Sequence, residues 1–198
     1  KQLTFHIQRY PGVNLELDYA GKQLYLHNRR NPEETTKVTI FIAALTYSDY
    51  FYAEGMTECD IRNWIRVNNN ALPYFGGVTP TVTPDNCKVA VARNKDWISP
   101  VLNKDFQAWA EHNNTVLTPA KVKSPRWKPV VEGHVKIITM HILVDMEYMV
   151  FYSLDDLNRV LMERVDAENR KPFDGLTYSR YDLFTTEEKE SLLPLPPS

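Results

Sequence analysis

Three carboxylates that lie far apart along the chain are the residues best suited to chemistry: Asp18, Asp85 and Glu132. Asp18 lies on a stretch of alternating apolar and polar residues, Asp85 directly follows a short β-prone segment, and Glu132 lies early in a predicted helix. Phosphodiester chemistry with two metal ions needs oxygen ligands that converge from separate elements onto ions about 3.5–4 Å apart. Carboxylates suit Mg²⁺, a hard cation that prefers oxygen. The three acids therefore predict a site for two Mg²⁺ ions, with Mn²⁺ as a substitute.

Each acid, taken singly, also has a purely structural interpretation. Asp18 could cap a turn before Gly21, and Asp85 could belong to a Pro-Asp-Asn turn. Glu132 could complement the helix dipole in an N-terminal turn. The metal-site hypothesis depends on the order of the acids, on a first strand, after a later strand and on a late helix.

The elements that must position these acids follow from hydrophobic periodicity. Strands are predicted over 13–19, 37–45, 50–56, 79–83 and 115–118, with 23–27 either continuing the first strand or pairing with it. Helices are predicted from Glu58, capped by Thr57, to before Pro73, and over 105–113, 129–146 and 154–168. This order predicts an α/β fold with a five-stranded mixed sheet, three antiparallel strands and then parallel ones, flanked by helices. Asp85 would follow the carboxyl end of a strand, where such sheets place their sites.

Composition narrows the class of protein. No apolar run approaches the roughly 18 residues of a membrane span, so an intracellular protein is expected. Cys59 and Cys87 form no metal-binding pair, which predicts reduced thiols. The formal net charge of −2 lacks the basic surplus that is usual for nucleic-acid binding. A metal site is itself acidic, and since the chain does not begin with Met, DNA-binding parts are expected in a longer protein.

Several motifs, in this order, resemble one family. They are Asn14–Gly21 (NLELDYAG), Thr83–Lys88 (TPDNCK), Lys128–Lys136 (KPVVEGHVK), Asn169–Phe173 (NRKPF) and Ser179–Phe184 (SRYDLF). The chain resembles the DDE transposases, which share an RNase H-like fold with retroviral integrases, and most closely the IstA-type transposases of two-gene insertion sequences. One motif departs from the family pattern, which usually reads Lys-Gly-Lys-Val-Glu, because Trp127-Lys128-Pro129-Val130-Val131 precedes Glu132 here.

The resemblance implies a catalytic mechanism and a division of the chain. Asp18 and Asp85 would bridge both ions and Glu132 would complete the shell of one, for cleavage at transposon ends and transfer of the 3′-hydroxyls into target DNA. The predicted domains are 1–12 as an N-terminal linker, 13–150 as an RNase H-like catalytic domain, and 151–198 as a helix with an extended C-terminal arm or linker. The expected location is the bacterial cytoplasm, at the nucleoid.

The resemblance also implies partners: transposon-end DNA, target DNA, an ATPase helper of the IstB type, and a homodimer or higher oligomer on DNA. Lys136, Lys128 and Trp127 are the predicted DNA contacts. Lys136 could equally pair with Glu132 at i,i+4, and Trp127 could be a core aromatic residue. Two rival functions stay open at this stage: a related RNase H-like nuclease, and a non-catalytic nucleic-acid-binding module of the same fold.

Overall fold

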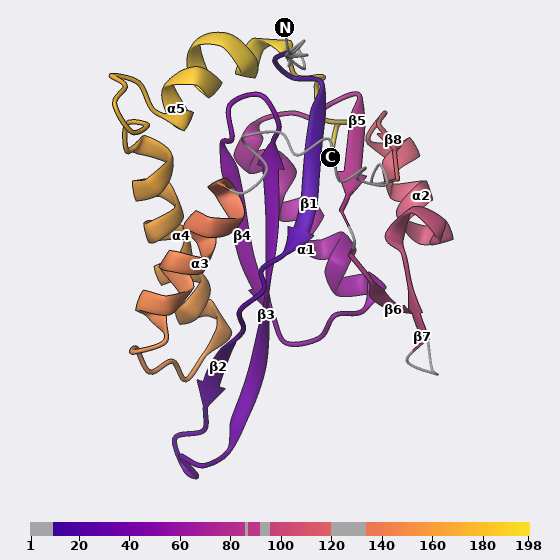
Figure 1. Ribbon diagram of the computed structural model, residues 1–198. Helices are drawn as coiled ribbons and strands as arrows, with labels where there is room; N and C mark the ends of the chain where they lie inside the picture. The colour runs from indigo at the N-terminus through magenta and orange to yellow at the C-terminus, as the bar shows by residue number, and fades with distance from the viewer. Residues whose placement is uncertain (1–9, 86, 92–95, 120–133) are drawn as a thin grey trace, which may run out of the picture.

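The computed structural model describes residues 10–85, 87–91, 96–119 and 134–198, and it is built around one mixed β-sheet (Figure 1). The sheet has six strands in the order β2-β3-β1-β5-β8, with β4 also paired to β3. The strands are β1 (Asn14–Tyr19), β2 (Leu24–His27), β3 (Thr35–Leu45), β4 (Phe51–Met56), β5 (Thr81–Pro84) and β8 (Val116–Leu117). The pairs β1–β3, β2–β3 and β3–β4 are antiparallel, whereas β1–β5 and β5–β8 are parallel. The predicted mixed sheet is confirmed.

The sheet has six strands rather than five because the first predicted strand is interrupted after Tyr19. Both β1 and β2 pair with the long strand β3, and the Ala20 N–H donates to the Ile40 carbonyl at 2.8 Å between them. The segment 23–27 thus continues the first strand along the same neighbour. A separate two-stranded sheet, β6 (Val89–Val91) with β7 (Asp96–Ile98), was not predicted.

Two helices cover one face of the sheet, α1 (Ile61–Phe75) and α2 (Lys104–His112). The core on this face includes Leu15 and Leu17 of β1 together with Trp64 of α1. The predicted start and end of α1 are wrong. Asp60 rather than Thr57 caps the helix, since its side chain accepts from the Asn63 N–H, and the helix continues through Pro73 to a left-handed Gly76.

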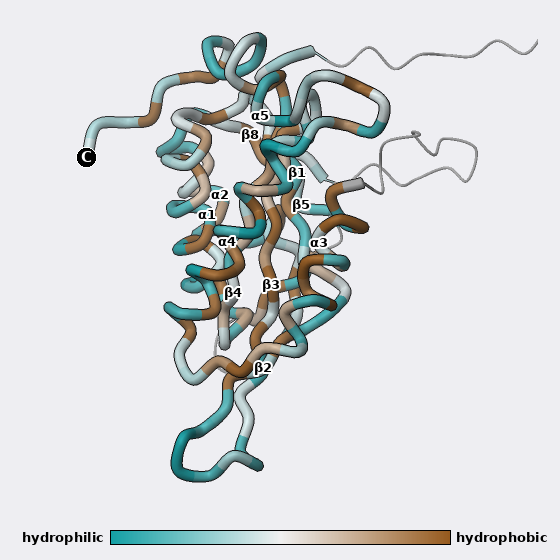
Figure 2. The backbone as a smooth tube through the Cα atoms, turned by 90° about the vertical axis from the view of Figure 1, so that its left-hand side faces the viewer, coloured by the Kyte–Doolittle hydropathy of each residue, from teal (hydrophilic) through white to brown (hydrophobic). Residues whose placement is uncertain are grey.

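The opposite face is covered by α3 (His134–Met146) and α4 (Leu154–Arg170). Figure 2 shows hydrophobic residues, in brown, along β3 and α3. Ile142, Leu143 and Met146 attach α3 to this face through buried side chains. Ser153 caps α4 as predicted. The predicted start of the first of these helices, near Pro129, lies outside the described residues. No helix in the described part of the chain is long and apolar enough to cross a membrane.

The C-terminal residues return to the sheet. After α4 come α5 (Arg180–Leu183), a π-helical turn η3 (Phe184–Glu188) and a 3-10 turn η4 (Lys189–Ser191), while another such turn, η2 (Pro100–Leu102), precedes α2. Phe184 stacks on Tyr50 with ring centroids 4.3 Å apart, and Leu193 forms a bridge with Val78. The segment predicted as an arm therefore contributes to the core, while the predicted domain boundaries stay a prediction.

Candidate active site

Asp18 is positioned by the alternation of side chains along β1. Leu15 and Leu17 point into the core beneath α1, so Asp18 faces the side covered by α3. Across the sheet it lies opposite Ile42 of β3. One carboxylate oxygen, Oδ1, accepts from the backbone N–H of Tyr19 at 2.8 Å, and the side chain is 26% exposed. Asp18 thus lies near the carboxyl end of β1, a strand with a paired neighbour on each side.

Asp85 is brought beside Asp18 by the parallel pairing of β1 with β5. Leu17 is the register partner of Pro84, and the Asp85 N–H donates to the Leu17 carbonyl at 2.8 Å. The two aspartates are the next residues on adjacent strands, which lie about 4.8 Å apart in a sheet. The pairing of β1 with β5 therefore places the backbones of these two acids beside each other at the carboxyl ends of both strands, while their meeting in one metal site stays a prediction.

The electrostatics of the pair disfavour two negative charges without a cation. Burial raises the pKa of Asp18 above its ordinary value, and the charge of Asp85 raises it further. The Lys136 ammonium and the Tyr19 N–H act in the opposite direction on the same pKa without cancelling the rise. A divalent cation between the two carboxylates would compensate both effects.

Cys87 contacts the backbone next to both aspartates. Its buried thiol lies 3.3 Å from the carbonyl oxygens of both Leu17 and Asp85, to which it donates. Burial and the charges of Asp18 and Asp85 raise the pKa of the Cys87 thiol far above its ordinary value, so the sulfur stays protonated. The predicted reduced thiol thus ties β1 to the segment after β5, a role that no sequence motif indicates.

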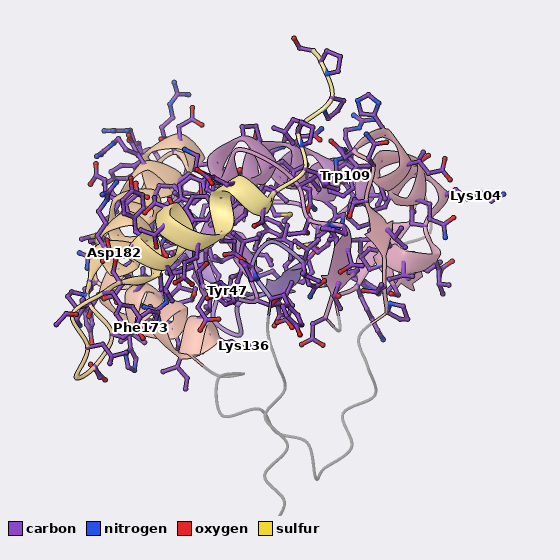
Figure 3. The ribbon with its side chains drawn as sticks, turned by 90° about the horizontal axis from the view of Figure 1, so that it is seen from above. Tyr47, Lys104, Trp109, Lys136, Phe173 and Asp182 are labelled. Carbon is purple, nitrogen blue, oxygen red and sulfur yellow. The ribbon has the colours of Figure 1, made fainter. Side chains whose placement is uncertain are left out.

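Lys136 completes the described part of the site from α3. Its Nζ lies 2.8 Å from Asp18 Oδ2, and its side chain is 54% exposed. Figure 3 places Lys136 at the rim of the molecule, well away from Trp109 and Lys104 of α2. The sequence predicted either a phosphate contact or a pair with Glu132 for this lysine. Its contact with Asp18 was missed because 118 residues separate the partners.

The rest of the predicted site lies outside the described residues. This holds for Glu132, Lys128 and Trp127, and for Asn86 beside Asp85. Within the described ranges, no group of three or more His, Cys, Asp or Glu side chains could hold a metal ion. Two acids on adjacent strands, with Asp18 Oδ2 facing α3, nevertheless fit a hard cation that keeps several waters, and a third acid would complete the set.

Comparisons with known proteins find that this chain is similar to transposases, although no family model matches it. It is 33% identical over 192 residues to the transposase for insertion sequence IS1162 of Pseudomonas fluorescens, covering 96% of this chain and 33% of the relative. It is 31% identical over 194 residues to the transposase y4bL/y4kJ/y4tB of Sinorhizobium fredii, covering 98% and 37%. The chain is a homologue of insertion-sequence transposases. The predicted resemblance is confirmed.

The chain also matches a transposase of lower sequence identity. The transposase for insertion sequence element IS21 of Pseudomonas aeruginosa is 26% identical over 197 residues, covering 98% of this chain and 47% of the relative. The chain thus spans between about a third and a half of the length of these curated relatives.

Solved structures confirm the predicted RNase H-like fold of the transposase homologue. The HTLV-2 integrase catalytic core domain in complex with magnesium matches with a TM-score of 0.56 at 12% identity, covering 89% of this chain and 97% of that one. A chain of the simian T-cell lymphotropic virus intasome, in complex with PP2A regulatory subunit B56 gamma, matches with a TM-score of 0.64 at 14% identity, covering 98% and 61%.

Proposed function

We propose that this chain is the catalytic core of a DNA transposase, which cuts DNA at transposon ends and joins the exposed 3′-hydroxyls to target DNA. The observation that carries the proposal is the placement of Asp18 and Asp85 side by side at the carboxyl ends of β1 and β5. The names of the relatives support the reaction, and the likeness to integrase cores supports the fold that performs it.

The proposed ligand set is Asp18, Asp85 and Glu132. If the helix of α3 extends back to Pro129, as the sequence predicts, Glu132 lies one turn before Lys136 and on the same side of the helix. Because Lys136 reaches Asp18, this direction would bring Glu132 toward the two aspartates. Two Mg²⁺ ions, for which Mn²⁺ could substitute, would activate the attacking oxygen and stabilise the leaving oxygen. Magnesium in a solved integrase core supports this choice of metal.

The chain's own residues would orient two successive displacements at phosphorus. In the first, water attacks a phosphodiester at the transposon end, and the P–O3′ bond breaks to leave a 3′-hydroxyl and a 5′-phosphate. In the second, that 3′-hydroxyl attacks a target phosphodiester and releases a target 3′-hydroxyl. One phosphodiester is formed for each one broken, so no nucleophilic side chain and no energy source are needed for joining. Asp18 and Asp85, fixed by strand pairing, would set the geometry of both steps.

The proposal includes partners that the described residues do not display. Transposon-end and target DNA are the substrates, which would place the reaction at the bacterial nucleoid, and Lys136, Lys128 and Trp127 are the proposed DNA contacts. A homodimer or higher oligomer on paired ends is supported by the dimeric and trimeric forms of the solved HTLV-2 integrase core. An ATPase helper of the IstB type is proposed from the resemblance to IstA-type transposases.

The test is a strand-transfer assay on the intact protein with Glu132→Gln and Asp18→Asn. We expect each variant to lose at least about a thousandfold in joining rate, since metal ligands contribute several kcal/mol to transition-state stabilisation. Binding to transposon-end DNA should persist. Asp145→Asn is the matched control, because this exposed acid lies at the other end of α3 and should leave the rate within about twofold.

Each other outcome selects a different function. Unchanged joining by Glu132→Gln would reject the proposed ligand set. Cleavage of an RNA–DNA hybrid or a DNA junction by the wild type, without joining, would indicate a related nuclease. DNA binding without cleavage of any substrate would indicate a non-catalytic module of the same fold.

A further inference from the structure

The two oxygens of Asp18 have different kinds of partner. Oδ1 accepts from the N–H of the next residue, Tyr19, at 2.8 Å, and this contact belongs to the strand itself. Oδ2 receives the ammonium of Lys136 at 2.8 Å, a contact from a different layer of the fold. Oδ2 is thus the oxygen that Asp18 presents toward α3.

The two partners in this ion pair also differ in mobility. Asp18 is fixed, because β1 is hydrogen-bonded to β3 on one side and to β5 on the other. Lys136 is about half exposed, and its strongly hydrated ammonium lies at the end of a flexible four-carbon stem. Exposed ion pairs of this kind contribute little to stability. The lysine side chain can therefore move away from Asp18 at a small cost in free energy, whereas the position of Asp18 is set by the pairing of β1.

Lys136 is not needed to attach α3 to the sheet. The helix is anchored by the buried side chains of Ile142, Leu143 and Met146, and Thr139 is fully buried one turn after the lysine. The Thr139 hydroxyl donates back to the Val135 carbonyl at 2.7 Å, within the helix. The ion pair is thus an addition to a helix that is already anchored.

We infer that Lys136 acts as a counterion that takes the place of the metal: its ammonium holds Asp18 Oδ2 while the site is metal-free, and a divalent cation displaces it. The inference rests on the proposed function, which makes Asp18 a metal ligand. A ligand oxygen lies about 2.0–2.1 Å from Mg²⁺, closer than any ammonium approaches. Since both cations are positive and need the same outward oxygen, they compete for it. In the metal-free site, Lys136 thus partly neutralises the charge of Asp18 with a cation that the chain itself supplies.

Displacement gives Lys136 a second use. Once released, the ammonium stays on α3 at the rim of the site, where the proposed DNA phosphates would lie. Metal binding would then expose a positive charge for DNA, and by linkage DNA would favour metal binding by the same factor. Lys136 would thus couple metal binding to DNA binding.

The test is the affinity of the intact protein for Mn²⁺ in the absence of DNA, measured by the electron paramagnetic resonance signal of the free ion. Lys136→Gln removes the competing charge, so we expect Mn²⁺ to bind about two- to fivefold more tightly than to the wild type. Lys136→Arg keeps the charge and should bind Mn²⁺ within about twofold of the wild type. Lys22→Gln is the matched control, because Lys22 pairs with Glu147, the residue after α3, and not with a proposed metal ligand, so this change should not affect Mn²⁺ binding.

The variants separate failure of this inference from failure of the proposed function. Unchanged or weaker Mn²⁺ binding by Lys136→Gln, with binding lost in Asp18→Asn, would overturn the counterion role and leave the metal site intact. Weaker binding in particular would assign Lys136 to holding Asp18 in position. Equal Mn²⁺ binding by wild type and Asp18→Asn, or none by either, would overturn both.

Discussion

A carboxylate whose pKa is raised by burial lies near each end of β1, and the two are held in opposite ways. Asp18 lies near its carboxyl end. Glu188, from the π-helical turn η3, lies near its other end, where Oε2 accepts from the Gly12 N–H at 2.9 Å and Oε1 from the Ser48 hydroxyl at 2.6 Å. Glu188 is fully buried, with a relative exposure of 0%. Burial raises the pKa of both acids.

The difference lies in the partners. Both oxygens of Glu188 are held by donors on the backbone or on a short side chain, so the acid is a fixed joint between the C-terminal turns and the sheet. Asp18 has one such donor, one flexible lysine and a second acid beside it. A buried acid whose oxygens are all held by rigid donors is structural, whereas one with an outward oxygen next to another acid is suited to bind a cation.

The largest effect on stability is expected where the joint is broken. Glu188→Ala would leave the Gly12 N–H and the Ser48 hydroxyl without their acceptor in a buried place, which costs about 2–3 kcal/mol in free energy of unfolding. The measurement is urea unfolding. Glu190→Ala, an exposed neighbour, should change this free energy by less than about 0.5 kcal/mol. Equal free energies of unfolding for the two variants would show that Glu188 has no structural role.

A smaller effect of the opposite sign is expected at the site end. Because burial raises the pKa of Asp18, its ionised form costs folding free energy at pH values above the folded-state pKa. This cost is lost as the pH falls through that pKa toward the ordinary value of 3.8. In metal-free buffer, Asp18→Asn should therefore melt at a higher temperature than the wild type at pH 7, and the two should converge toward pH 4. A lower melting temperature of the variant at pH 7 would mean that Asp18 is structural after all.

Local patterns in the sequence predict the strands and the meeting of Asp18 with Asp85. The order of the acids along the chain motivates the hypothesis that they meet at one sheet edge, and alternation along β1 decides which side Asp18 faces. The parallel pairing that makes β1 and β5 neighbours was not predicted and comes from the structure. The interruption between β1 and β2 and the hairpin of β6 and β7 could not be predicted, because short strands depend on the neighbours that they find.

Contacts between distant residues were beyond the sequence patterns. Thr57 and Asp60 are both good caps, and only the observed bond to Asn63 decides between them.

The Lys136–Asp18 pair and the Glu188 joint link residues more than a hundred positions apart. The acids of the 187–190 segment are expected from sequence to be solvated, and only the fold shows that Glu188 is buried.

The most direct test of the metal site is a crystal of the intact protein soaked in Mn²⁺ and measured for anomalous scattering. The account predicts an anomalous peak between the carboxylates of Asp18 and Asp85, with the Lys136 ammonium turned away from Asp18 Oδ2. An ordered site that shows no peak between the two acids at saturating Mn²⁺, with Lys136 still paired to Asp18, would contradict it.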